Sequence, residues 1–278
     1  MLTNLAWMHA ALEQFPEAEK ILRDAYELAK ETLGPLHPST LSCGNNLASI
    51  YNNLGRYDDG IALLRSIADA QRRVLGADHP QTLISLNNVG FALLQLGRTD
   101  EAAPLLENVL EVRTRVLGET HPHTLASMSN LGSLRRRQKR FDEAEQICRR
   151  NLELHTKTLG AGHPETIYCL QDIVKLHLAR NDHAAAEPFL KQLIEQRERM
   201  LPGSDPLLAK MHEMHGICLL QMEHFEEAEA ALLKAHKLPE QIAGPDNPKI
   251  RTTMKHLVDL YRRWNREESR LAWEERLK

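Results

Sequence analysis

Apolar residues recur along the chain in paired stripes, each with the spacing of an α-helix. One pair combines a first stripe of Leu41, Leu47, Ile50, Tyr51 and Leu54 with a second stripe of Ile61, Leu64, Ile67, Ala68, Val74 and Leu75. Steps of three and four residues place such positions on one face of a helix. Residues 55–57, Gly-Arg-Tyr, separate the two stripes. The pattern therefore predicts a helix A from about Pro38 to Leu54, a turn, and a helix B from about Asp58 to Val74.

This helix pair returns every 42 residues without insertion. The linkers that mark it are LGPLHPSTL from Leu33, LGADHPQTL from Leu75, LGETHPHTL from Leu117 and LGAGHPETI from Leu159, followed by LPGSDPLL and AGPDNP at the same step. A fixed period of this length indicates units stacked on their neighbours, because one pair alone leaves an apolar face uncovered. We expect repeat units over residues 35–76, 77–118, 119–160, 161–202 and 203–244, with truncated units over 1–34 and 245–278.

Seven helix pairs predict an all-α fold. We expect one solenoid domain over residues 1–278, in which fourteen helices form a right-handed superhelix without strands. The chain opens inside a helix A, because Asn4 lies 42 residues before Asn46. We therefore expect the N-terminus to be a fragment boundary, and a missing upstream catalytic or signalling domain is left open.

The linker motif has a structural interpretation. Proline suits the first helical turn because it has no N–H, and the residue before it is excluded from the α region and becomes the N-cap. Asp205 and Asn247, which are strong capping types, occupy the histidine position in the last two linkers. We therefore expect four linker histidines to cap helices and to bind no metal: His37, His79, His121 and His163.

No cofactor, metal or catalytic site is expected. His212 and His215 lie three residues apart, whereas a zinc-protease helix needs two histidines four residues apart. No phosphate-binding glycine loop or nucleophile elbow is present. A net charge of −3 argues against nucleic acid or an anionic membrane as partner, and no stretch is apolar enough to span a bilayer. The sequence thus favours a non-catalytic, cytoplasmic protein.

Residue types at fixed repeat positions identify a family resemblance. The pattern comprises small residues at Ala6, Ala48, Gly90 and Gly132, turn glycines at Gly55 and Gly97, aromatics at Phe15, Tyr57, Phe141 and Phe225, and alanines at Ala18, Ala102, Ala144, Ala186 and Ala228. It resembles the tetratricopeptide repeat. The 42-residue spacing, the LGxxHPxTL linker and the phrase GNNLASIYNNLGRY are similar to kinesin light chain and to related arrays in bacterial and fungal signalling proteins. This fold hosts many unrelated partners.

The resemblance implies that helix A of each repeat lines a concave groove. One helix A position is asparagine in four successive repeats, Asn4, Asn46, Asn88 and Asn130, and then becomes Asp172, Met214 and His256. In tetratricopeptide superhelices such as kinesin light chain and O-GlcNAc transferase, an asparagine at the matching position holds the backbone of a bound peptide. A carboxamide suits this role because it donates and accepts, as a peptide unit does. The alternative is a hydrogen bond that only ties neighbouring repeats.

Neighbouring positions complete the predicted peptide site. Asn45 and Asn87 stand next to this asparagine ladder, and Phe91 lies three residues beyond Asn88, where it would help to form a side-chain pocket. The charge run RRRQKR over residues 135–140 is a solvated helix end, an anchor for acidic partner residues or a nuclear import signal. Kinesin light chain repeats favour peptides with acidic residues around an aromatic, which favours the anchor. The resemblance also implies that Arg136 and Arg137 point toward the concave side, so they are the preferred members of such an anchor.

Two functions follow as hypotheses. The first is a scaffold that binds an extended, acidic, aromatic-containing segment in the groove between about the second and fifth repeat units. The second is a structural spacer or self-association array within a larger signalling protein. The sequence leaves the identity of the partner and the oligomeric state open.

Overall fold

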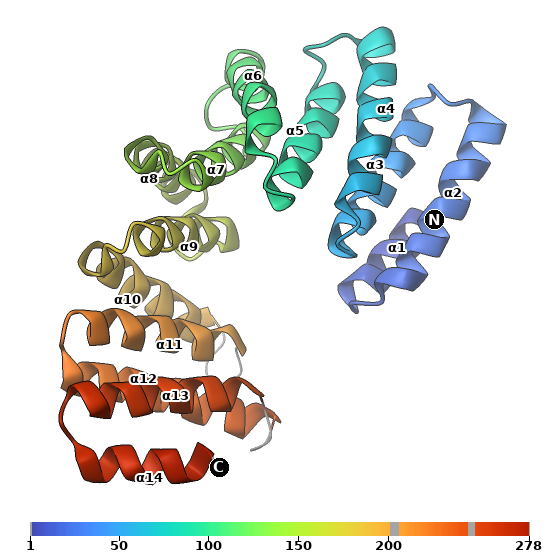
Figure 1. Cartoon of the computed structure of the whole chain (residues 1–278). Coiled ribbons are helices and arrows are strands. Elements are labelled where there is room, and N and C mark those ends of the chain that lie inside the picture. Colours follow the sequence, from blue (N-terminus) through green and yellow to red (C-terminus); the bar gives the residue numbers. More distant parts are fainter. Residues whose placement is uncertain (1, 201–205, 244–247, 278) are drawn as a thin grey trace. The chain divides into compact units, whose positions relative to one another are not determined.

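The computed structural model describes residues 2–200, 206–243 and 248–277, which contain helices and turns but no strand (Figure 1). The helices are α1 (Leu2–Ala11), α2 (Phe15–Leu33), α3 (Pro38–Asn53), α4 (Tyr57–Leu75), α5 (Pro80–Gln95), α6 (Thr99–Leu117), α7 (Pro122–Arg137), α8 (Phe141–Leu159), α9 (Pro164–Ala179), α10 (His183–Met200), α11 (Pro206–Gln221), α12 (Phe225–Ala243), α13 (Pro248–Arg263) and α14 (Glu267–Leu277). The all-α fold of repeated helix pairs is confirmed. Helices α3 and α4 begin and end within one residue of their predicted bounds.

The helices group into two compact units, Met1–Ile147 and Cys148–Lys278, each of which is described by itself. Within the first unit, consecutive helices pack together, and the odd-numbered helices also contact one another: α1 with α3, α3 with α5, and α5 with α7. In the described part of this unit, the backbones of α2, α4 and α6 do not approach one another in this way, and α4 and α6 are joined at their surfaces by the Arg65–Glu101 ion pair at 3.1 Å. The odd-numbered A helices therefore form the crowded inner row of the unit. A single solenoid domain over residues 1–278 stays a prediction.

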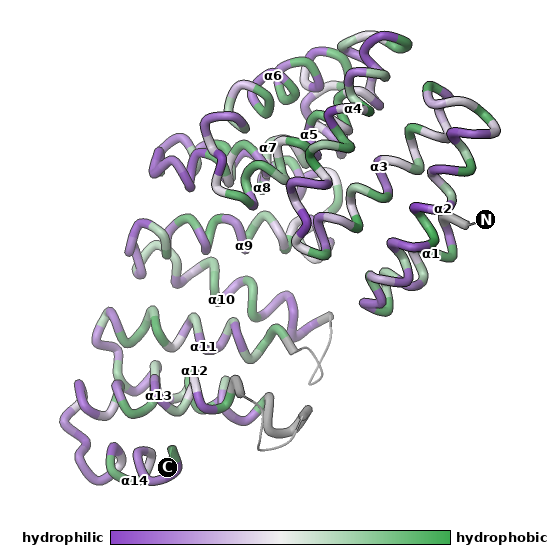
Figure 2. Tube along the Cα trace, turned by 45° about the vertical axis from the view of Figure 1, so that its right-hand side comes forward, coloured by the Kyte–Doolittle hydropathy of each residue, from purple (hydrophilic) through white to green (hydrophobic). Residues whose placement is uncertain are grey.

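The core of each unit lies between the helix A and helix B rows. In the first unit it includes Leu64, Val89, Leu93 and Leu106, each at most 1% exposed. Hydrophobic and hydrophilic residues alternate along the helices with helical spacing, as Figure 2 shows. The small-residue position of helix A permits close approach to helix B, because a Cβ added at Gly90 would lie only 2.4 Å from Leu106 Cδ2. The predicted stripes are thus the packed faces.

The linker histidines cap the A helices, as predicted. The Nδ1 atoms of His37, His79, His121 and His163 each accept a hydrogen bond from the backbone N–H two residues later, at 3.1–3.2 Å. Asp205 and Asn247, the corresponding residues of the last two linkers, lie outside the described residues.

The linker threonines add a contact that the sequence analysis did not single out. Thr40, Thr82, Thr124 and Thr166 are at most 1% exposed, and each donates to the carbonyl of the glycine six residues earlier, at 2.8–2.9 Å. This bond satisfies a carbonyl that follows the end of helix B, so the linker holds both helix ends that it joins. The recurrence of threonine at one linker position was the available signal.

Replacing His79 with alanine should lower the free energy of unfolding by about 0.5–2 kcal/mol, because an N-terminal N–H of α5 loses its acceptor. His79→Asn should retain most of the stability, because a carboxamide oxygen can accept the same bond. Urea unfolding followed by circular dichroism measures both variants. Equal stability of His79→Ala and the wild type would contradict the capping role.

Candidate functional site

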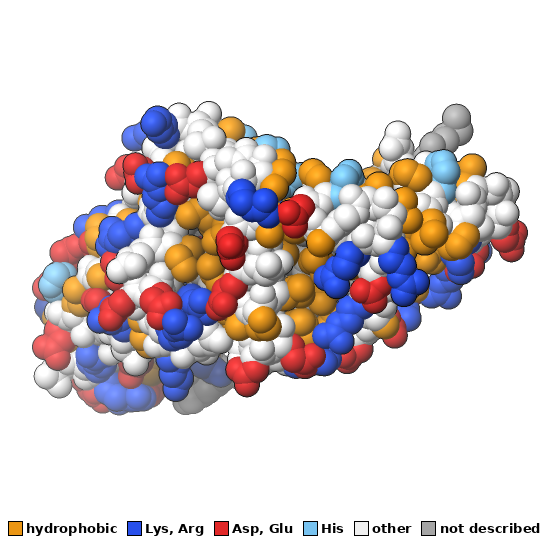
Figure 3. Space-filling view, turned by 90° about the horizontal axis from the view of Figure 1, so that it is seen from above, with side chains coloured by type: hydrophobic (Ala, Val, Ile, Leu, Met, Phe, Trp, Pro, Cys, Tyr) orange, Lys and Arg blue, Asp and Glu red, His pale blue; other side chains and the backbone are white. Residues whose placement is uncertain are grey.

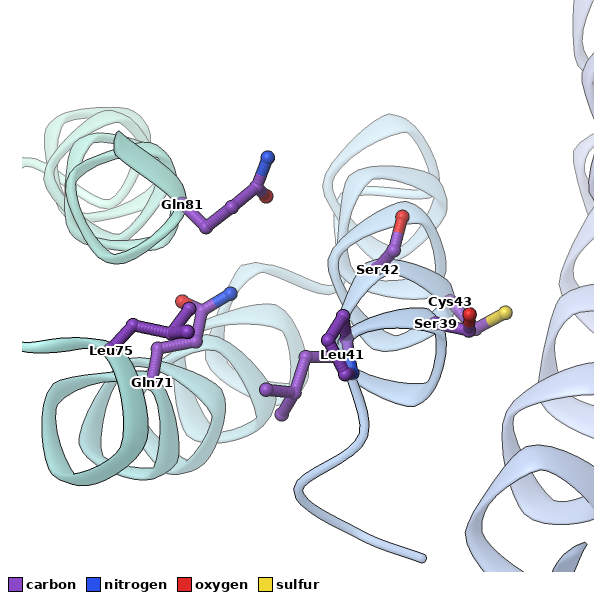
Figure 4. A pocket seen from close by; sticks show the side chains of 8 residues that line it. Ser39, Leu41, Ser42, Cys43, Gln71, Leu75 and Gln81 are labelled. Atoms are coloured by element: carbon purple, nitrogen blue, oxygen red, sulfur yellow. The ribbon is translucent and has the colours of Figure 1, made fainter. Parts of the chain in front are cut away.

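An open hollow of 460 Å³ lies between the N-terminal halves of α3 and α5, above α4 (Figure 4). Pro38, Ser39, Leu41, Ser42 and Cys43 of α3, Gln71 and Leu75 of α4, and Gln81 of α5 line it. Gln71 is 1% exposed, yet its carboxamide extends from α4 toward the space between the two A helices (Figure 4). Helix B therefore contributes a polar side chain to the floor of a surface formed by helix A, which the sequence analysis did not anticipate.

The four ladder asparagines lie on α1, α3, α5 and α7, all in the first unit. Asn4 is exposed, whereas Asn46 and Asn88 are half-buried. The side chains of Asn46 and Asn88 make no hydrogen bond to any residue whose side chain the structure describes. Asn130 differs, because its Nδ2 donates to Asn87 Oδ1 at 3.2 Å. Asn46 and Asn88 thus present carboxamides without partners among the described residues, and Asn130 presents one that is partly engaged.

The asparagines beside the ladder tie successive repeats together. Asn45 Oδ1 accepts from Ser85 Oγ at 2.9 Å, and Asn87 Oδ1 accepts from Ser127 Oγ at 3.2 Å. Both pairs join residues 40 positions apart, on neighbouring A helices. These contacts favour the structural interpretation for Asn45 and Asn87.

A similar tie occurs in the second unit. Thr253 Oγ1 donates to Glu213 Oε1 at 3.4 Å, and His256 Nδ1 lies 3.2 Å from the same oxygen. The acceptor position therefore receives contacts from residues 40 and 43 positions later, as Asn87 does from Ser127 and Asn130. The sequence signal for this tie was a hydroxyl residue at the same repeat position of helix A, namely Ser85, Ser127 and Thr253.

The aromatic side chain predicted for the site is available at the surface. Phe91 on α5 is 39% exposed, and Trp7, at the same repeat position on α1, is 44% exposed. Exposed aromatic rings are frequent in the contact surfaces of protein interfaces. Both residues lie in the first unit, as the asparagine ladder does.

The arginine run at the end of α7 has members in different environments. Arg135 is only 8% exposed, and its Nη2 donates to Glu107 Oε1 at 2.6 Å while its Nε lies 3.3 Å from Glu143 Oε2. Arg136 is half-buried, with Nη2 at 3.5 Å from Ser133 Oγ, and Arg137 is exposed. Acidic and basic side chains are interspersed on the face in Figure 3. Arg135 thus holds helices together, whereas Arg137 is available to a partner.

His212 and His215 of α11 contact different glutamates. His212 Nε2 lies 3.5 Å from Glu198 Oε1, and His215 Nε2 lies 3.4 Å from Glu187 Oε1. Burial lowers the pKa of both imidazoles. Among the residues that the structure describes, no three or more His, Cys, Asp or Glu side chains gather as a metal site would require. The helices within those residues also include none that is long and apolar enough to cross a membrane.

The repeats and their packing correspond to a known family. The tetratricopeptide repeat matches residues 41–107, 84–146 and 124–199, and a second tetratricopeptide repeat pattern matches residues 1–39. These ranges cover more than half of the chain. The chain therefore belongs to the tetratricopeptide repeat family, whose fold supports protein–protein interaction. No curated protein matches its sequence.

Solved structures show the same fold. The nearly identical TPR-like repeats of a Podosopora anserina protein described as a kinesin light chain are 25% identical, with a TM-score of 0.61 over 72% of this chain and 94% of that chain. BtubC from P. vanneervenii is 18% identical, with a TM-score of 0.70 over 85% of this chain and 94% of that one. A Rap protein complexed with Competence and Sporulation Factor is 12% identical, with a TM-score of 0.66 over 99% and 72%, respectively. The last two similarities concern the fold alone.

Proposed function

We propose that the inner row of A helices in the first unit binds an extended partner segment, with Asn46, Asn88 and Asn130 on the backbone of that segment. The observation that carries this proposal is the pair of half-buried carboxamides, Asn46 and Asn88, that lack hydrogen-bond partners among the described residues. An extended segment brings one N–H and one C=O per residue, and a carboxamide can satisfy both. Equivalent positions on successive helices would contact successive parts of the segment.

Side chains around the ladder would select the sequence of the segment. Phe91 offers an exposed ring, and Arg136 and Arg137 offer positive charge at the end of α7. An acidic segment that contains an aromatic residue complements both features. The complex of the Rap protein shows that a molecule of this fold can hold a bound factor. The proposal includes a non-catalytic role and a cytoplasmic location, which stay predictions from the sequence.

The second candidate function, a spacer or self-association array, has specific support at some of these positions. Asn45 and Asn87 accept hydrogen bonds from the next repeat, and Asn130 donates to Asn87. If the whole ladder served only such ties, the inner row would need no ligand. The two functions differ in what happens when the ladder asparagines are removed.

The double substitution Asn88→Ala, Asn130→Ala should weaken segment binding about tenfold or more, because each lost neutral hydrogen bond removes about 0.5–1.5 kcal/mol. Peptides selected on an array with the wild type, followed by fluorescence anisotropy, measure the effect. Asn108→Ala is the matched control, because Asn108 is exposed on α6, outside the inner row, and should leave binding unchanged.

Equal binding by the wild type and the double variant would contradict the proposed role of the ladder. The array would then fit the spacer function. Thermal unfolding of both proteins separates this outcome from a general loss of structure, since a variant with the wild-type melting temperature keeps its fold.

A further inference from the structure

Arg113 on α6 is a buried cation without an acidic partner. Its side chain is 2% exposed, and Nη1 donates to the carbonyl of His123 at 2.9 Å and to Ser127 Oγ at 2.6 Å. Within the described residues no carboxylate contacts it, and only Nη1 makes a hydrogen bond. Nε and Nη2 are not fully enclosed by the protein. Burial lowers the pKa of Arg113 to about 10. Arg135, which is almost as buried, has Glu107 and Glu143 as partners.

An uncompensated buried charge is unfavourable, so its presence needs a reason. The two donors without acceptors, Nε and Nη2, form one edge of the planar guanidinium. That edge matches the two oxygens of a carboxylate or of another oxyanion, which can accept two parallel hydrogen bonds. The two bonds from Nη1 hold the opposite side of the group and fix its orientation.

The repeat register places Arg113 beside the inner row. Arg113, Leu117 and His123 stand 42 residues after Gln71, Leu75 and Gln81, which line the hollow between α3 and α5. Gln71 lines that hollow although it is 1% exposed, so the low exposure of Arg113 is compatible with the same role. The corresponding place for Arg113 lies between the N-terminal halves of α5 and α7.

A helix terminus and two imidazole rings surround this place. The N-terminus of α7 contributes the partial positive charge of its first N–H groups. The rings of His121 and His123 lie there with centroids 5.3 Å apart, and burial, with Arg113 nearby, lowers the pKa of His123. An anion that entered here would meet the guanidinium edge and the helix terminus together.

We propose that Arg113 is an oxyanion-binding residue at the inner row, between the N-terminal halves of α5 and α7. The inference rests on the proposed function in one respect: the physiological oxyanion is an Asp or Glu side chain of the bound segment. Within the first unit, the preceding repeats present Ala29 and Gln71 at the same position, so the requirement for an acid applies to one place along that unit.

Inorganic phosphate tests the site without any peptide. The melting temperatures of the wild type, Arg113→Gln and Arg115→Gln are compared in sodium phosphate and in sodium chloride of equal ionic strength. Glutamine is the residue of the preceding repeat, and Arg115 is an exposed residue of the same helix that pairs with Asp78. Because phosphate stabilises folded proteins in general, the difference between variants is the readout.

Phosphate should raise the melting temperature of the wild type and of Arg115→Gln by about 2–4 °C more than that of Arg113→Gln. An equal rise in the wild type and Arg113→Gln overturns the proposal. If Arg113→Gln does not fold, Arg113→Lys supplies the comparison, because lysine keeps the charge but loses the two-donor edge and should show the smaller rise.

A peptide pair then tests the source of the anion. A peptide selected on the wild type is remade with each Glu replaced by Gln and each Asp by Asn, one at a time, and binding is measured by anisotropy. One replacement should weaken wild-type binding about tenfold or more, and the same replacement should change binding to Arg113→Gln less than about threefold. If every replacement affects both proteins equally, a segment carboxylate does not bind Arg113. If no peptide binds the wild type, the proposed function fails, while the phosphate comparison still decides the site.

Discussion

Replacing Leu106 with alanine should lower the free energy of unfolding of the first unit by about 2–5 kcal/mol. Leu106 has no exposed surface and belongs to the core cluster that also contains Val89 and Leu93 of α5. The substitution removes buried apolar area and leaves a cavity that the close-packed helices can fill only in part. Urea unfolding of the whole chain, followed by circular dichroism, measures the loss.

Leu96→Ala is the matched control for this prediction. Leu96 follows α5 directly and is 38% exposed, so its truncation should change the free energy of unfolding by less than about 1 kcal/mol. If the two truncations cost the same, burial against helix B would not be the source of stability in this repeat.

A methyl group added at Gly90 should destabilise the first unit by about 1–3 kcal/mol, although alanine is the better helix former. The added Cβ would lie 2.4 Å from Leu106 Cδ2 and 2.7 Å from Leu106 Cγ, closer than side-chain atoms can approach. Leu106 is fully buried and cannot turn away without displacing its neighbours. Thermal and urea unfolding of Gly90→Ala measure the effect.

A double-mutant cycle tests whether the clash with Leu106 causes the destabilisation. In the Leu106→Ala background the clashing atoms are absent, so Gly90→Ala should become neutral or stabilising, by up to about 1 kcal/mol from helix propensity. If the losses in free energy of unfolding of the two single variants add up in the double variant, Gly90 is required for a reason other than its close approach to Leu106.

The sequence was sufficient to predict the helices and their succession. Helix α3 begins at Pro38 because proline fixes the first turn and His37 caps it, and these are local effects that a sequence displays directly. The constant step of 42 residues then predicts each following pair, because stacking tolerates no insertion.

Side-chain partners across helices were harder to predict. In the sequence, the arginine run predicts one patch of charge. In the structure, Arg135 is buried and donates to Glu107, which lies 28 residues earlier on another helix. Likewise, the asparagine column is visible in the sequence, but only packing brings Ser127 to Asn87.

Arg113 illustrates a signal that was visible but not used. It lies on the buried face of α6 with Val109 and Val112, where a charged residue interrupts an apolar stripe. A cation at such a position requires a partner or a ligand. The sequence shows the anomaly, while the lack of a carboxylate near it emerges only when the described helices are packed.

The contacts of the first unit, which reach no further than the next helix but one, have a mechanical consequence. Each repeat contacts only its neighbours, so small changes in the geometry of successive interfaces add up along the row of A helices. Small changes at each interface would add up in the distances from Asn46 to Asn88 and from Asn88 to Asn130, while one core cluster continues from α3 to α7. A fully extended backbone spans at most about 3.3–3.6 Å per residue, so the spacing of the A helices would have to match the segment that the unit holds.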